Sequence, residues 1–106
     1  MATIQVNEGT FEREVVKSTV PVLVDFWAPW CMPCKALMPT VEGIASEMGD
    51  RIKVAKINID ESPQLANQFS IMSIPTLLIF HQGKVAEQIV GTPSKDKILA
   101  KVNQYL

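Results

Sequence analysis

The chain has 106 residues and lacks the features that mark several common classes of protein. Its 10 Lys and Arg are balanced by 11 Asp and Glu, and the net charge of −1 argues against nucleic-acid or membrane-surface binding, which needs clustered basic residues. No stretch approaches the roughly 20 apolar residues of a membrane span. Residues 1–5 lack the basic-then-apolar pattern of a secretion signal, so we expect a cytoplasmic protein.

Cysteine and histidine are also scarce: the chain has two cysteines and one histidine, His81. Zinc sites need four ligands, and a second cysteine or histidine pair is missing, so we expect no metal site. Two cysteines in a chain without an export signal also do not suggest a stabilising disulfide framework. The pair therefore favours redox chemistry.

The composition fits one soluble globular domain covering residues 1–106, because 47% of the residues are apolar and 20% are charged. Apolar periodicity predicts strands over 3–6, 20–27, 52–59, 76–80 and 85–90. It predicts helices over 10–17, 32–48, 62–68 and from 94 to the end, with Ser62 and Ser94 as caps and Leu106 on an apolar face. The alternation favours parallel strands, the last two strands form a hairpin, and helices should cover both faces of this mixed sheet.

The segment Trp30-Cys31-Met32-Pro33-Cys34-Lys35 follows directly on the apolar strand over 22–27. A thiol at the start of a helix meets unpaired N–H groups and a partial positive charge, which favour the thiolate of Cys31. Cys34 lies one turn further on, close enough to form a disulfide, and should keep its proton longer. The alternative is that both cysteines are simply small buried apolar residues.

Asp25 interrupts an otherwise apolar strand. A carboxylate there would be costly to ionise, so we expect a raised pKa, unless the side chain lies at a solvated edge. Trp27 is expected in the core and Trp30 on the surface. Three methionines are expected to fill gaps in the core: Met38, Met48 and Met72.

Residues 24–35 also resemble the active-site segment of the thioredoxin family, and the likeness continues through 54–60, 73–77, Gly83 and Gly91. The one departure is Met32, where the family usually has Gly. The resemblance covers essentially the whole chain. It implies the thioredoxin fold, an α/β architecture with a central mixed five-stranded sheet flanked by four helices.

The resemblance also implies roles for individual residues. Asp25 would lie beneath Cys34 and help to take its proton, with Lys56 as the partner of Asp25, although Lys56 could instead be a plain surface lysine. The Ile74–Pro75 bond would be cis and face the disulfide, against the low general frequency of cis proline. A docking surface would be formed by Trp30, Met32, Pro33, Ser73, Ile74, Pro75 and Gly91.

The implied function is protein disulfide reduction by a monomer, in which Cys31 attacks, Cys34 resolves, and a thioredoxin reductase restores the dithiol. Disulfide oxidases and isomerases of this fold usually carry His in place of Pro33 and need an export signal. A third possibility is a non-catalytic subunit that uses only the docking surface. Met32 leaves the reduction potential and the choice of reductase open.

Overall fold

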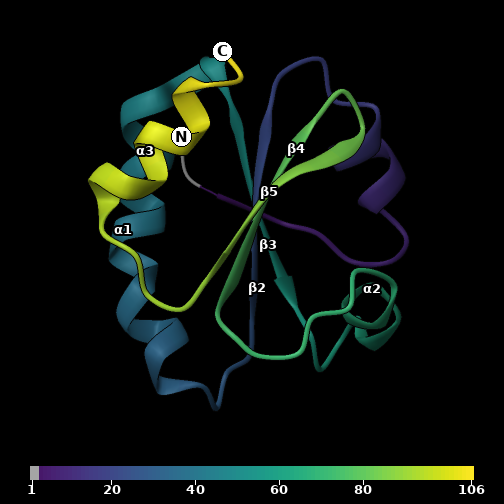
Figure 1. Cartoon of the computed structure of the whole chain (residues 1–106). Coiled ribbons are helices and arrows are strands. Elements are labelled where there is room, and N and C mark those ends of the chain that lie inside the picture. The colour runs from purple at the N-terminus through teal and green to yellow at the C-terminus, as the bar shows by residue number, and fades with distance from the viewer. Residues whose placement is uncertain (1–2) are drawn as a thin grey trace.

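The computed structural model describes residues 3–106 as a five-stranded mixed sheet with helices on both faces (Figure 1). The strands are β1 (Ile4–Gln5), β2 (Val22–Trp27), β3 (Lys53–Asn58), β4 (Thr76–His81) and β5 (Lys84–Val90). The helical segments are the π-helical turn η1 (Glu12–Val16), α1 (Met32–Met48), the 3-10 turn η2 (Gly49–Arg51), α2 (Pro63–Gln68) and α3 (Lys95–Asn103). The predicted mixed sheet is confirmed, and its four predicted flanking helices correspond to η1, α1, α2 and α3. Over residues 3–106, no helix has both the length and the apolar character to cross a membrane.

Strand β2 lies at the centre of the sheet, whose order is β1-β3-β2-β4-β5. Strands β1 and β2 both pair with β3 in parallel, whereas β4 runs antiparallel to β2 and to β5. The parallel first half and the antiparallel closing hairpin are as predicted. In this register Asp25 stands beside Lys56 on one side and Leu77 on the other.

Alternate residues of each strand are buried on opposite faces of the sheet, because successive side chains point to opposite sides. Leu23 and Leu77 belong to the core under α1 and α3, whereas Val24 and Leu78 belong to the core under η1 and α2. Asp25 is two residues from Leu23, and Lys56 is two residues from Val54, which is also in the α1 core. Both charged side chains therefore lie on the face that α1 covers.

Helix α1 has the bounds predicted from its apolar periodicity. Its predicted core-facing stripe is buried throughout: Leu37, Val41, Ile44, Ala45 and Met48. Gly49 ends the helix with a φ of +56°, a conformation that few other residues adopt readily. Pro39 lies inside the helix, and the kink expected there remains a prediction.

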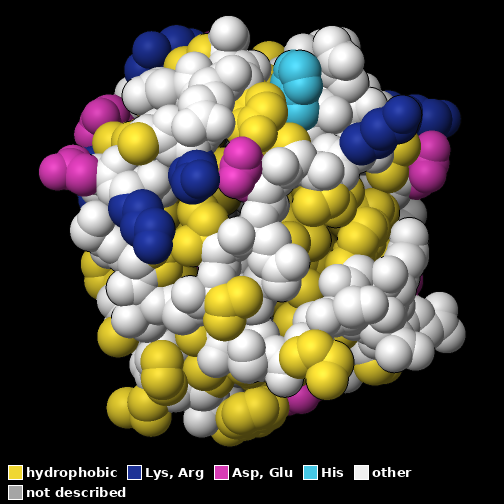
Figure 2. Space-filling view, in the orientation of Figure 1, with side chains coloured by type: hydrophobic (Ala, Val, Ile, Leu, Met, Phe, Trp, Pro, Cys, Tyr) yellow, Lys and Arg dark blue, Asp and Glu magenta, His cyan; other side chains and the backbone are white. Residues whose placement is uncertain are grey.

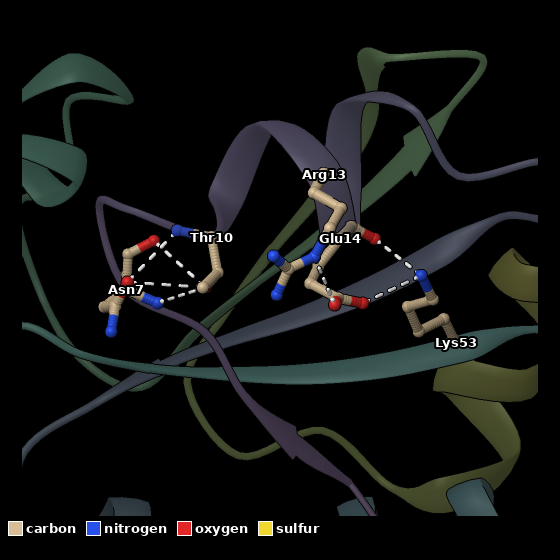
Figure 3. Close-up of polar contacts among 5 residues, drawn as sticks. All are labelled: Asn7, Thr10, Arg13, Glu14 and Lys53. Carbon is tan, nitrogen blue, oxygen red and sulfur yellow. Dashed lines mark hydrogen bonds and ion pairs between the residues drawn. The ribbon is translucent and has the colours of Figure 1, made fainter.

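The first predicted helix is instead the short π-helical turn η1, in which the Lys17 N–H donates to the Glu12 carbonyl. The Glu14 carbonyl accepts from Lys53 Nζ at 2.9 Å, and its carboxylate pairs with the same ammonium at 3.2 Å (Figure 3). Ahead of η1, the Asn7 side chain accepts the Thr10 N–H. The two Lys53 contacts join η1 to β3, and the π-helical form of η1 is one that periodicity does not distinguish from an α-helix.

Two further details differ from the sequence prediction. Ser62 stands at the start of α2, but its hydroxyl is buried and does not cap the helix. Leu106 is 56% exposed because α3 ends at Asn103, so its predicted place on an apolar helix face is wrong. The Ser94 cap is confirmed, since its hydroxyl accepts the Lys97 N–H at 3.2 Å.

Candidate functional site

The two cysteines lie where β2 leads into α1, and they form a disulfide in this structure. Cys31 is the N-cap of α1 in an extended conformation, and Cys34 lies in the first turn. Their Cα atoms are 5.3 Å apart, which is within the usual range for a disulfide. The two cysteines therefore lie together at a helix N-terminus, as predicted from the sequence.

The surroundings of the two sulfurs differ. The Cys34 N–H donates to Cys31 Sγ at 3.2 Å, so an amide at the start of the helix, where donors lack helical partners, already points at this sulfur. Cys31 is 5% exposed and Cys34 is fully buried. An outside disulfide can therefore approach Cys31 more easily, and the same N–H would stabilise its thiolate.

A loop before β4 packs against the disulfide. The Ile74–Pro75 bond is cis, as the resemblance implied, and the Ile74 carbonyl oxygen lies 3.9 Å from Cys31 Sγ. The Pro75 carbonyl accepts the Gly91 N–H at 3.0 Å, which joins the end of β5 to this loop. Ser73 is exposed, and its carbonyl accepts the Thr76 hydroxyl.

Large apolar side chains are exposed beside the disulfide: Trp30 at 65%, Met32 at 70% and Met72 at 92%. Figure 2 shows hydrophobic side chains gathered along the lower edge of the molecule, the end at which β2 leads into α1. Trp30, Met72, Ser73 and Ile74 contribute to the wall of a cavity of about 340 Å³. The prediction that Met72 fills a gap in the core is wrong, because it lies on the exposed loop before Pro75.

Trp30 is held by a residue that was not among the predicted site residues. Its indole N–H donates to both carboxylate oxygens of Asp60, at 3.0 and 3.3 Å. Asp60 is the last residue of segment 54–60, which resembles the thioredoxin family. Its place in that segment is the sequence feature that could have marked it as a site residue. Pro33 is exposed in the first turn of α1, where its missing N–H leaves no helical bond unmade. Trp27, which was expected in the core, is only partly buried and packs against the cluster of Ala28, Cys31 and Cys34.

Asp25 is completely buried on the α1 face of β2, so the alternative of a solvated edge residue is wrong. Its two carboxylate oxygens make no hydrogen bond to any described residue. Burial raises the pKa of Asp25 to about 7, and the attraction of the Lys56 charge offsets only part of this effect. The raised pKa predicted from the apolar strand is confirmed.

Lys56, the expected partner of Asp25, makes no hydrogen bond to it. Its ammonium lies 3.4 Å from a carboxylate oxygen of Glu42 and 3.5 Å from the sulfur of Met38, both on α1. It also lies 5.9 Å from the centre of the Trp27 ring. Lys56 is thus neither a plain surface lysine nor a hydrogen-bond donor to Asp25. Sequence reasoning missed Glu42, although it stands one turn beyond Met38 on the same helix.

A cavity of about 480 Å³ elsewhere in the molecule is lined by Arg51, His81 and Tyr105. None of the predicted site residues lines it. The chemistry expected from the sequence therefore does not depend on this cavity, and we place the site at the disulfide.

Comparison with known proteins agrees with this site. A sequence model of the thioredoxin family matches residues 2–104. Thioredoxin M-type, chloroplastic, of Chlamydomonas reinhardtii is 50% identical over 101 residues, which cover 95% of this chain and 72% of that protein. Thioredoxin of Acidithiobacillus ferridurans is 49% identical over 105 residues, 99% of this chain and 97% of that protein. Thioredoxin 1 of Nostoc sp. is 48% identical over 105 residues, covering 99% and 98% respectively. The chain therefore belongs to the thioredoxin family, and its Cys31–Cys34 pair makes it a dithiol thiol–disulfide oxidoreductase.

Proposed function

We propose that this protein reduces disulfides in other proteins, with Cys31 as the attacking thiolate and Cys34 as the resolving thiol. The Cys31 thiolate attacks one substrate sulfur, which forms a mixed disulfide and releases the other substrate sulfur as a thiolate. Cys34 then loses its proton and attacks Cys31 Sγ, which releases the second substrate sulfur. Two electrons pass to the substrate, and the Cys31–Cys34 disulfide remains. The observation that carries this assignment is the Cys34 N–H directed at Cys31 Sγ.

Asp25 is proposed as the group that takes the proton of Cys34, through water. A base works best when its pKa lies near the working pH, and the pKa of Asp25 is raised to about 7. Asp25 lies on the sheet face that α1 covers, and Cys34 lies in the first turn of α1. Lys56 would modulate this base by its charge.

The docking surface for substrate is proposed to comprise Trp30, Met32, Pro33, Ser73, Ile74, Pro75 and Gly91. The N–H of Ile74 has no hydrogen-bond partner among residues 3–106, so an extended peptide could pair with this backbone as an added strand. The exposed side chains of Trp30 and Met32 supply apolar contact area beside the disulfide.

Thioredoxins act on disulfide-containing proteins and are in general reduced by a thioredoxin reductase. We propose the same cycle for this chain, as a monomer of one domain, in the cytoplasm and without a metal or organic cofactor. One relative is named as a chloroplast protein and another comes from the bacterium Acidithiobacillus ferridurans, so the compartment and the type of reductase are part of the proposal.

Trapping of mixed disulfides tests the assignment. Reduced Cys34→Ser protein, incubated with insulin, should accumulate a covalent complex because no second thiol can resolve it. Cys31→Ser protein should form none, and only the wild type should turn over. Complexes formed through Cys34 in the Cys31→Ser protein would reverse the roles. Wild-type protein that docks insulin without reducing it would favour a non-catalytic subunit.

A further inference from the structure

We propose that Glu42 is a positioning residue of the redox site, which holds the Lys56 ammonium away from the Asp25 carboxylate. The inference rests on the role proposed above for Asp25. It concerns a residue that the dithiol mechanism does not otherwise use.

The backbone alone would favour a direct pair between Asp25 and Lys56. The two residues are partners in the parallel β2–β3 register, and both side chains lie on the face covered by α1. A buried carboxylate without hydrogen bonds should attract a nearby ammonium strongly. The Asp25 oxygens nevertheless make no hydrogen bond to any described residue. The Lys56 ammonium therefore does not reach the Asp25 carboxylate, although the register sets the two residues side by side.

Helix α1 supplies the competing contacts. Glu42 Oε2 lies 3.4 Å from Lys56 Nζ, and Met38 Sδ lies 3.5 Å from it. The Lys56 side chain is only 14% exposed, so water solvates its ammonium poorly. A negatively charged partner therefore stabilises this ammonium more than it would stabilise one at the surface. Glu42 is the one negatively charged group in this set, and its attraction holds the ammonium on the helix side.

Glu42 is itself held in place from the other side. The Thr3 hydroxyl donates to the same oxygen, Oε2, at 2.9 Å. Burial opposes ionisation of Glu42, but the Thr3 hydroxyl and the Lys56 ammonium outweigh it and lower the pKa of this carboxyl. Glu42 is therefore an anion at neutral pH, anchored between the chain segment before β1 and the lysine of β3.

Among the described residues, Lys56 of β3 is the one charged group that shifts the pKa of Asp25, so the effect of Glu42 on that lysine can be isolated. Helix α1, which covers this face, carries Glu42 and, in the reduced protein, the Cys34 thiol. From β4 the partner is Leu77, which carries no charge. If Glu42 is removed, Lys56 loses its anionic partner and can turn towards Asp25. The carboxylate of Asp25 would then form at lower pH and would be a weaker base for Cys34.

The test is to titrate Asp25 by NMR of its side-chain carboxyl carbon in the oxidised protein, where Cys34 does not titrate. Glu42→Ala should lower the pKa of Asp25 by about one unit, the low end of what an opposite charge at close range produces. The matched control is Glu47→Ala, because Glu47 also lies on α1 and pairs with Lys95 instead, at 2.6 Å. It should leave the pKa of Asp25 unchanged.

Loss of a negative charge could also lower the pKa of Asp25 directly, without moving Lys56. The Lys56→Met background separates the two routes, since Glu42→Ala should then shift the pKa of Asp25 far less. Equal shifts in both backgrounds, or no shift with Glu42→Ala alone, would overturn the inference. The pH profile of mixed-disulfide release, measured in parallel, should move to lower pH. If the pKa falls but this profile stays fixed, Glu42 positions Lys56 as inferred and the proposed role of Asp25 is wrong.

Discussion

Asp25 is the residue whose surroundings suit its ionised side chain least. It is fully buried, its oxygens lack hydrogen bonds within the described chain, and its pKa is raised to about 7 from 3.8. As pH rises, the unfolded chain loses the Asp25 proton first, while the folded chain retains it. Stability is therefore lost between about pH 4 and pH 7, and the loss is complete above the folded pKa. The shift corresponds to roughly 4 kcal/mol.

Replacing Asp25 by Asn should abolish this loss, because the amide stays neutral at every pH. Urea denaturation of the oxidised proteins should show similar stabilities near pH 4 and a growing advantage of Asp25→Asn up to about pH 7. Asp50→Asn changes an exposed carboxylate and serves as the control. Wild-type and Asp25→Asn curves that remain parallel from acid to alkaline pH would contradict this explanation.

Met32 is the residue at which this chain departs from its family. Its side chain is 70% exposed and adds no charge to the start of α1. Met32→Gly should therefore shift the reduction potential by no more than about 30 mV, or about 1.4 kcal/mol for a two-electron couple. The larger change should be in kcat/KM with a thioredoxin reductase, because Met32 enlarges the apolar surface beside Trp30. A larger shift in potential with unchanged reductase kinetics would show that Met32 acts on the sulfur chemistry instead.

At this scale the sequence was most informative where one residue conflicts with its local pattern. A carboxylate in an apolar strand predicted the burial and raised pKa of Asp25. The true partner of Lys56 could not be predicted, because the Glu42 contact depends on how α1 lies across β3. The exposure of Met72 was missed since an apolar side chain by itself does not reveal which way a loop turns.

At the scale of elements, a glycine is required in the turn of the β4–β5 hairpin but not inside α1. Gly83 has a φ of +81°, and a Cβ atom there would lie 3.1 Å from the Val16 carbonyl oxygen. Gly43 lies inside α1, and a Cβ atom there would meet nothing within 4 Å. The same substitution should therefore have opposite effects in the two elements.

Gly83→Ala should destabilise the protein by about 1–2 kcal/mol, since alanine is strained at this φ and crowds η1. Gly43→Ala should stabilise it by about 0.5–1 kcal/mol, because alanine restricts the unfolded chain and favours the helix. Equilibrium urea denaturation of the two variants and the wild type measures both effects. Changes of the same sign in the two variants would show that backbone conformation does not govern them.

Element prediction succeeded where an apolar pattern was long. The stripe from Leu37 to Met48 fixed α1, and the hairpin signal before β5 fixed the closing strands. It failed at short or terminal elements. Segment η1 is a π-helical turn in place of the helix predicted over 10–17, and α3 ends at Asn103, before Leu106. Ser62 stands where a cap is expected, but its buried hydroxyl makes no hydrogen bond to the helix, which the residue type alone does not reveal.

At the scale of the whole molecule, the fold brings distant segments to one end of the sheet. The β2–α1 junction carries the disulfide and Trp30, and the loop before β4 brings Ile74 to 3.9 Å from Cys31 Sγ. The α1 side of the sheet carries Asp25 and Lys56. The segments that resemble the thioredoxin family predicted that these residues meet at one site. Periodicity alone predicted only a mixed sheet between helices.

The reduction potential of the Cys31–Cys34 couple, measured against glutathione buffers, tests the central claim that this protein is a disulfide reductant. Oxidases and reductases of this fold differ in potential by about 150 mV, roughly 7 kcal/mol for two electrons. We expect a value within about 30 mV of the roughly −270 mV of thioredoxin. A value near −120 mV, as in the periplasmic disulfide oxidase, would contradict the proposed function and assign the dithiol to disulfide formation.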